Sequence, residues 1–214
     1  MRKPSPAILF GAGLAATALL ASSQALAYHQ GDFITRVGVV QVDPKSDNGS
    51  IDALGLTGLK VDVDNDTNLG FTLTYLFHDK LGVELLAALP FKHDISIADG
   101  AVTGSTKHLP PTLSLQYYPL GGTGAQVQPY AGAGLNYTHF FSEEVNVPGA
   151  DLDLDSSWGL AGQLGVDVRM NENWGVNAAA WYVDIDTDAS LNGEVIGTVN
   201  IDPWVFMAGI SYRF

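Results

Sequence analysis

The sequence predicts an all-β protein: an eight-stranded antiparallel transmembrane β-barrel with short periplasmic turns and longer extracellular loops. Three observations predict this fold. Apolar and polar residues alternate with a period of two in successive segments, the connections alternate between short and long, and acidic residues gather in the long connections. Period-two alternation is typical of strands whose two faces meet different surroundings. Short turns at one end and long loops at the other are typical of outer-membrane barrels.

The first 27 residues have the three parts of a secretory signal peptide. A basic start at Arg2 and Lys3 precedes an apolar run from Ala7 to Leu20, and a segment rich in small residues then ends in Ala25-Leu26-Ala27. This pattern predicts cleavage after Ala27, so that residues 28–214 form the barrel. The apolar run is shorter than the roughly 20 residues of a spanning helix, which disfavours the alternative of a retained anchor.

Eight strands can be drawn along the remaining chain. In the clearest one, the apolar side chains at alternate positions from Leu69 to Phe77 oppose Gly70, Thr72 and Thr74. The alternating segments lie near residues 33–42, 69–77, 81–89, 112–117, 134–138, 158–169, 176–182 and 204–214. Residues 78–80 and 171–173 are tight turns, whereas long connections lie near 44–66, 94–106, 142–155 and 187–199. An even number of strands returns both termini to the periplasmic side.

The charge follows the same division. The net charge is −13, although 46% of the residues are hydrophobic, and 18 of the 23 acidic residues fall in or beside the four long connections. The acidity therefore belongs to the outer rim of the barrel. It disfavours nucleic acid as a partner, because no basic surface is available to neutralise phosphates. The absence of cysteine excludes thiolate chemistry and Cys-ligated metals.

A soluble barrel of the lipocalin type is the structural alternative, with its apolar face turned inward. Two features favour the membrane. The chain ends on a strand with a terminal aromatic residue, Phe214. Aromatic residues also gather at strand ends, as interfacial girdles require; they are Phe77, Tyr117, Phe141, Trp158, Trp174, Tyr182 and Trp204. The sequence therefore predicts an integral protein of a Gram-negative outer membrane.

Several segments, in order along the chain, resemble the outer membrane protein W (OmpW) family. They are residues 81–88, 108–113, 129–137, 157–159, 181–187 and 202–207. The resemblance implies a small barrel with a narrow, largely hydrophobic interior that passes small apolar molecules across the outer membrane. Close relatives in this family assist alkane uptake. The resemblance also implies that Tyr212 and Phe214 are the signal read by the barrel-assembly machinery.

Leu86 and Trp181 fall on the inward parity of their strands. Side chains can fill the interior of an eight-stranded barrel, so one interpretation of both residues is a plugged core. The other is that they line an apolar ligand pocket and narrow it. The family resemblance supports the second interpretation, because members place large apolar residues at these two positions.

Three prolines, Pro90, Pro110 and Pro111, lie where the third and fourth strands enter their outer loop. Because proline cannot donate to a strand ladder, it is normally kept to edges and bulges. The simple interpretation is that the strands end here. The sharper hypothesis is a lateral seam through which an apolar ligand leaves into the bilayer.

The acidic rim offers oxygen ligands suited to Ca²⁺ or Mg²⁺. Its two densest runs, residues 62–66 and 151–155, lack the glycine and closing glutamate of a calcium loop. A solvated acidic surface facing lipopolysaccharide is therefore expected, with no dedicated metal site and no cofactor.

Catalysis has little support in the sequence, and no enzyme is expected. The histidines show no metal-ligand spacing, and no Gly-x-Ser-x-Gly elbow is present. The rival hypothesis is an enzyme built at the rim from His93, His108 and His139, because triads are defined by geometry that a sequence hides.

The expected function is to bind small hydrophobic molecules and pass them through a narrow apolar lumen. The expected partners are outer-membrane lipid, lipopolysaccharide, the barrel-assembly machinery and small apolar ligands. Two alternatives stay open. One is a structural or adhesive surface barrel with a plugged interior. The other is a small ion-conducting pore that uses the inward Glu84, Asp167 and Arg169.

Overall fold

A computed structural model describes residues 27–45, 48–53 and 56–214. The predicted signal peptide, apart from Ala27, lies outside the described residues. Within the described ranges, no helix is long and apolar enough to cross a membrane.

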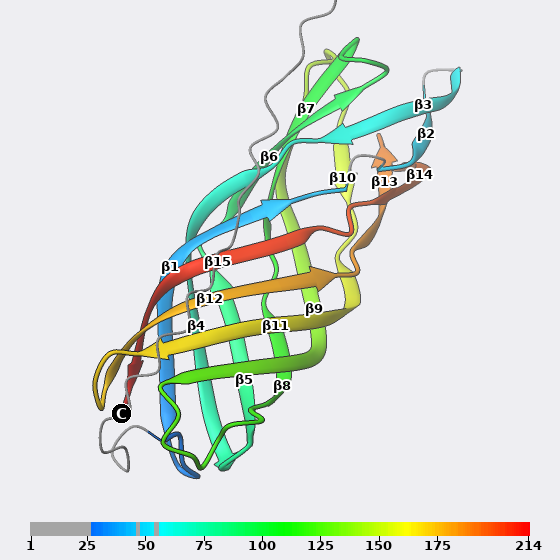
Figure 1. The fold of residues 1–214 in the computed structure, drawn as a ribbon. Helices are drawn as coiled ribbons and strands as arrows, with labels where there is room; N and C mark the ends of the chain where they lie inside the picture. Colours follow the sequence, from blue (N-terminus) through cyan, green and yellow to red (C-terminus); the bar gives the residue numbers. More distant parts are fainter. Residues whose placement is uncertain (1–26, 46–47, 54–55) are drawn as a thin grey trace, which may run out of the picture.

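Eight strands form a closed antiparallel ring (Figure 1). Around the ring they are β1 (Phe33–Asp43), β4 (Asp66–His78), β5 (Leu81–Ala88), β8 (Thr112–Tyr117), β9 (Val127–Val145), β11 (Ser157–Arg169), β12 (Trp174–Val183) and β15 (Trp204–Arg213). Pairing of β1 with β15 and of β9 with β11 completes the ring. The predicted eight-stranded barrel is confirmed.

The outer surface of the ring is apolar. On β4, Leu69 is 55% exposed, and Phe71, Leu73 and Tyr75 are exposed at alternate positions, while the intervening Thr72 and Thr74 are buried. A wide band of exposed aliphatic and aromatic side chains would be costly in water but is suited to lipid. The side chains therefore have the opposite arrangement to that of a soluble lipocalin-like barrel.

Aromatic pairs mark the two borders of this apolar band. Tyr137 packs on Trp158 with ring centroids 4.8 Å apart, and Tyr182 packs on Trp204 at 5.4 Å. At the other border Trp174 meets Tyr212 edge-on at 4.7 Å. Such girdles place amphipathic rings at the membrane–water interfaces.

The two ends of the barrel differ. The short-turn end carries the C-terminus and the connections at residues 79–80, 118–126 and 170–173 (Figure 1). At the opposite end, which we call the hairpin end, the long connections are themselves largely paired strands. These are β2 (Ser50–Ala53), β3 (Leu56–Val63), β6 (Phe91–Ile97), β7 (Val102–Leu109), β10 (Leu152–Leu154), β13 (Asp186–Leu191) and β14 (Glu194–Asn200). These strands extend the barrel wall beyond the apolar band. The sequence had predicted loops in these segments.

Candidate ligand conduit

Arg36 on β1 lies at the centre of a buried polar network in the short-turn half of the lumen. Its guanidinium is fully buried and bridges two carboxylates: Nη1 lies 2.9 Å from Glu84 on β5, and Nη2 lies 2.6 Å from Asp167 on β11. It also donates to the hydroxyls of Thr74 at 2.8 Å and Tyr118 at 3.0 Å. A charge taken out of water is tolerated only when it is paired and hydrogen-bonded, and Arg36 meets both conditions.

Amide side chains complete this polar layer. Gln163 donates to Glu84 at 2.7 Å and accepts a bond from Gln116 at 3.0 Å. Asn177 on β12 donates to Asp167 at 2.9 Å. The network therefore spans the barrel from wall to wall, and we call it the polar floor, meaning Arg36, Glu84, Asp167 and the side chains bonded to them.

Tyr28 lies below the polar floor, near the start of the described chain. Its ring meets Tyr118 edge-on at 5.7 Å, and the guanidinium of Arg169 lies 5.0 Å from its centroid. Arg169 also donates to the backbone carbonyl of Glu172 at 2.7 Å. The charged groups that suggested ion conduction are thus all engaged: Glu84 and Asp167 by Arg36, and Arg169 by the turn.

Above the polar floor the lumen becomes apolar. The structure turns both Leu86 and Trp181 inward, with 5% and 1% of their surfaces exposed. Leu86 helps to line a cavity of about 20 Å³, the inner cavity, together with Val40, Phe91 and Val205. Trp181 belongs to the same apolar cluster but lies outside the lining of this cavity. A volume of this size holds roughly one water molecule, so a larger ligand requires the walls to move.

The predicted prolines flank a break in the ring of backbone hydrogen bonds. The β5–β8 ladder stops at the pair Leu86–Thr112, and pairing resumes beyond the barrel at Phe91–His108 between β6 and β7. Within the described chain, no backbone pairing joins residues 87–90 to residues 109–111, and we call this break the seam. Pro90 lies on one side of it.

Each side of the seam is held by its other neighbour. Leu89 donates to Leu69 on β4 at 2.9 Å, and the carbonyl of Pro90 accepts a bond from the side chain of Asn68. On the other side, the carbonyl of Pro111 accepts a bond from Tyr137 on β9 at 3.0 Å. Residues 87 and 88 and Pro110 line the inner cavity, so the cavity reaches the seam.

A second apolar cavity, of about 30 Å³, lies within the hairpin end, and we call it the outer cavity. His93 on β6 and His108 on β7 line it beside Phe140 on β9. Burial lowers the pKa of His93. Burial, with a smaller contribution from the imidazole of His93, lowers the pKa of His108 to about 3. Both rings are therefore neutral at physiological pH.

Acidification is expected to loosen the hairpin end. The folded pKa of His108 is below the unfolded value of 6.5, so the unfolded state takes up the proton first. The contribution of His108 to the free energy of unfolding is therefore complete above pH 6.5. It should fall by about 1.4 kcal/mol per pH unit as the pH drops from 6.5 toward 3. Hydrogen exchange of the β6 and β7 amides, corrected for intrinsic rates, would measure this. Replacing His108 with phenylalanine should flatten the pH dependence, and an unchanged slope would contradict the assignment.

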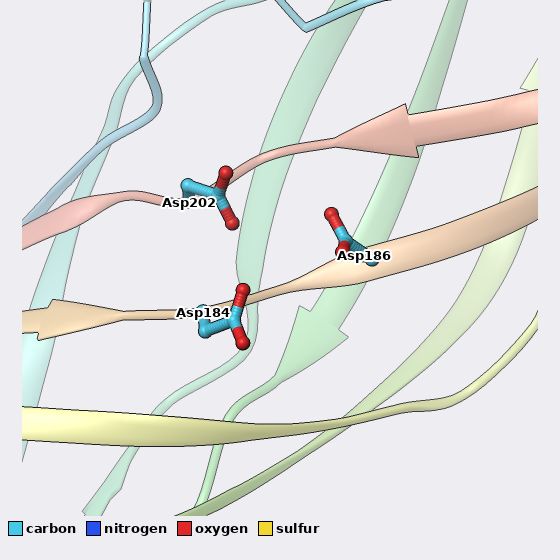
Figure 2. Close-up of side chains that lie close together, drawn as sticks. All are labelled: Asp184, Asp186 and Asp202. Carbon is cyan, nitrogen blue, oxygen red and sulfur yellow. The ribbon is translucent and has the colours of Figure 1, made fainter.

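Three carboxylates of the acidic rim meet where β12 and β15 leave the barrel. Asp184, Asp186 and Asp202 offer oxygens within 4.8 Å of one another (Figure 2). Lys45 already forms an ion pair with Asp202 at 2.6 Å, and Asn200 donates to Asp186. The cluster therefore has its own partners within the protein. It joins Asp184 and Asp186 with Asp202, and none of the three belongs to the two dense acidic runs.

The residues of the predicted assembly signal lie at the short-turn end. Tyr212 packs between Trp174 and Phe214, whose ring lies 4.8 Å away, and Phe214 is 71% exposed at the rim of the apolar band. The backbone N–H of Phe214 donates to the backbone carbonyl of Phe33 at 2.9 Å, which fixes the last residue to β1.

Sequence reasoning did not single out Arg36, the residue that organises the polar floor. The sequence did contain a signal for it. Arg36 is a charged residue at an inward position of β1, where the other inward residues are apolar or small. In the strand register it lies opposite Thr72 and Ser211. The stacked pair of His93 and His108 was also not foreseen as a unit, since nothing local shows that β6 and β7 face each other.

Comparison with known proteins places these features in context. Residues 29–214 match the OmpW family. Outer membrane protein W of Escherichia coli is 45% identical over 211 residues, which cover 95% of this chain and 97% of that protein. The crystal structure of OprG from Pseudomonas aeruginosa superposes with a TM-score of 0.81 at 47% identity, covering 88% of this chain and 98% of that one. A more distant relative, 29% identical over 164 residues covering 73% of this chain and 76% of that protein, is the dibenzothiophene metabolism operon protein PahQ of Pseudomonas aeruginosa.

Proposed function

Since this chain belongs to the OmpW family of outer-membrane β-barrels, we propose that it admits small hydrophobic molecules from outside the cell and releases them sideways into the membrane. The hairpin end faces the outside, and the short-turn end faces the periplasm. The observation that carries the proposal is the seam, because an apolar cavity reaches it above the polar floor.

The sideways route agrees with the energetics of an apolar solute. Transfer from a lipid-like environment into water costs roughly 25 cal/mol per Å² of apolar surface, so a ligand gains nothing by entering the periplasm. The polar floor would add the cost of separating Arg36 from Glu84 and Asp167. Release through the seam requires neither step.

The substrate class is supported by the name of a relative. PahQ is named for an operon of dibenzothiophene metabolism, and dibenzothiophene is an apolar aromatic molecule. The pairing of Glu84 and Asp167 with Arg36 counts against the alternative of an ion-conducting pore. A structural or adhesive barrel would need neither an inner cavity nor a seam.

The test is uptake of a labelled medium-chain alkane by cells that lack their own related barrel, with and without this protein. Protein-dependent uptake is expected. Equal uptake in both would favour the structural or adhesive barrel, and single-channel steps in planar bilayers would favour the pore.

Closing the seam should reduce this uptake. In an antiparallel strand the N–H and C=O of one residue face the same neighbour. The carbonyl of Pro111 faces β9, so the nitrogen of Pro110 faces the seam. Pro110→Thr therefore adds a donor across the seam, and one such bond should lower uptake roughly 2- to 10-fold.

Pro111→Thr is the matched control, because its new N–H faces β9, and it should leave uptake near the level of the unaltered protein. The double variant should resemble Pro110→Thr. Unchanged uptake in the double variant, with the barrel folded, would count against release through the seam.

A further inference from the structure

Two histidines form a stacked pair inside the hairpin end, beyond the membrane-spanning strands. His93 and His108 have ring centroids 4.8 Å apart and ring planes 13° apart, and each is only 2% exposed. Phe91 lies beside the pair, 5.6 Å from His108 and 6.4 Å from His93, and Phe140 lies 5.8 Å from His108. Four flat rings therefore gather at this point of the hairpin end.

The pair lies on the path from the outer cavity to the inner one. His93 and His108 line the outer cavity, whose other walls are mainly aliphatic, and His108 also lines the inner cavity beside Leu86. A ligand moving from one cavity to the other therefore passes the face or edge of His108.

The hydrogen bonds of the two rings are incomplete. His93 Nδ1 lies 2.5 Å from the backbone carbonyl of Asp64. A carbonyl can only accept, so Nδ1 carries the proton of the neutral ring, and Nε2 presents a lone pair. Among the described residues, His93 Nε2 and both ring nitrogens of His108 are buried without a hydrogen-bond partner. A buried polar atom without a partner is costly, so a ligand that supplies one gains affinity.

We propose that His93 and His108 form a hydroxyl-binding site at the entrance to the lumen, and that the protein favours aromatic molecules bearing a hydroxyl over the bare hydrocarbons. A hydroxyl both donates and accepts, so it can donate to His93 Nε2 and accept from the N–H of His108. The flat rings of Phe91, His108 and Phe140 suit an aromatic body. This inference rests on the proposed function and specifies its substrate class.

The test compares naphthalene with 1-naphthol, which differ by one hydroxyl. Binding would be measured to the full barrel in lipid nanodiscs and corrected with empty nanodiscs. The double variant His93→Phe, His108→Phe keeps the stacked aromatic rings but removes the ring nitrogens. It should weaken 1-naphthol binding by roughly 5- to 100-fold, as expected for two hydrogen bonds, and leave naphthalene binding unchanged or tighter. His78→Phe, at an exposed position of the short-turn end, is the control and should change neither.

A measurement on the unaltered protein avoids dependence on the folding of the variant. In ¹⁵N spectra of the histidine rings, 1-naphthol should shift the His93 Nε2 resonance and naphthalene should not. Equal binding of the two probes, or equal loss of both in the variant, would overturn the hydroxyl site while leaving apolar transport intact. Binding of neither probe, together with no protein-dependent alkane uptake, would overturn the proposed function and the hydroxyl site with it.

Discussion

Replacing Arg36 with methionine is expected to lower the free energy of unfolding by about 3–5 kcal/mol, because it leaves Glu84 and Asp167 as buried carboxylates without a counter-ion. Methionine fills much of the volume of the arginine stem, so the loss reports the charge rather than a cavity. Urea unfolding of the barrel in lipid vesicles, followed by tryptophan fluorescence, would measure it.

A neutral triple variant is the matched control for this loss. Arg36→Met combined with Glu84→Gln and Asp167→Asn removes all three charges and keeps their approximate shapes. Because replacing a whole buried ionic group is often nearly neutral, the triple variant should recover most of the stability. If Arg36→Met alone unfolds at the same urea concentration as the unaltered protein, the polar floor does not hold the barrel together.

Arginine at Leu86 and Trp181 should nearly abolish alkane uptake. Both side chains are inward and buried in the apolar half of the lumen, where the inner cavity has room for roughly one water molecule. The guanidinium at position 86 would enter that space, and the one at position 181 would add a second charge to the same apolar cluster. Both would hold water, so that an apolar ligand loses its contacts. We expect a decrease of at least roughly tenfold, which corresponds to about 1.4 kcal/mol.

Two further variants define what this result means. Leu86→Met with Trp181→Phe keeps the lumen apolar at similar volume and should retain uptake, whereas Leu86→Ala with Trp181→Ala widens it and should raise uptake. Heat-modifiable migration on gels would show that each barrel is folded. Arginine variants that fold and still transport at the unaltered rate would place the ligand path away from these residues.

The barrel could be predicted because its two wall faces differ so strongly. Leu69 and Phe71 lie on the outer face, which contacts lipid, and Thr72 and Thr74 lie on the inner face, which lines the lumen. This difference makes the period of two visible in the sequence. The same parity correctly turns Leu86 inward. The extensions were harder to foresee, because above the apolar band the outer face is polar and a strand there resembles a loop.

The site itself depends on contacts that no local pattern shows. Arg36 and Asp167 are 131 residues apart in sequence and meet only because the ring closes. The height of each inward residue depends on the stagger between strands, so parity alone could not show that Trp181 lies outside the lining of the inner cavity. Likewise, the opposition of His93 and His108 depends on the register between β6 and β7.

The polar floor also has a consequence for the cell that makes this protein. If the proposed function holds, a barrel that is crossed by the polar floor and releases its ligand toward lipid would give ions, sugars and polar antibiotics no continuous watery passage, whatever its abundance. Expression could therefore rise greatly without making the cell envelope leaky to such solutes. The cell could then raise its uptake of apolar nutrients through expression of this protein without weakening its exclusion of polar toxins.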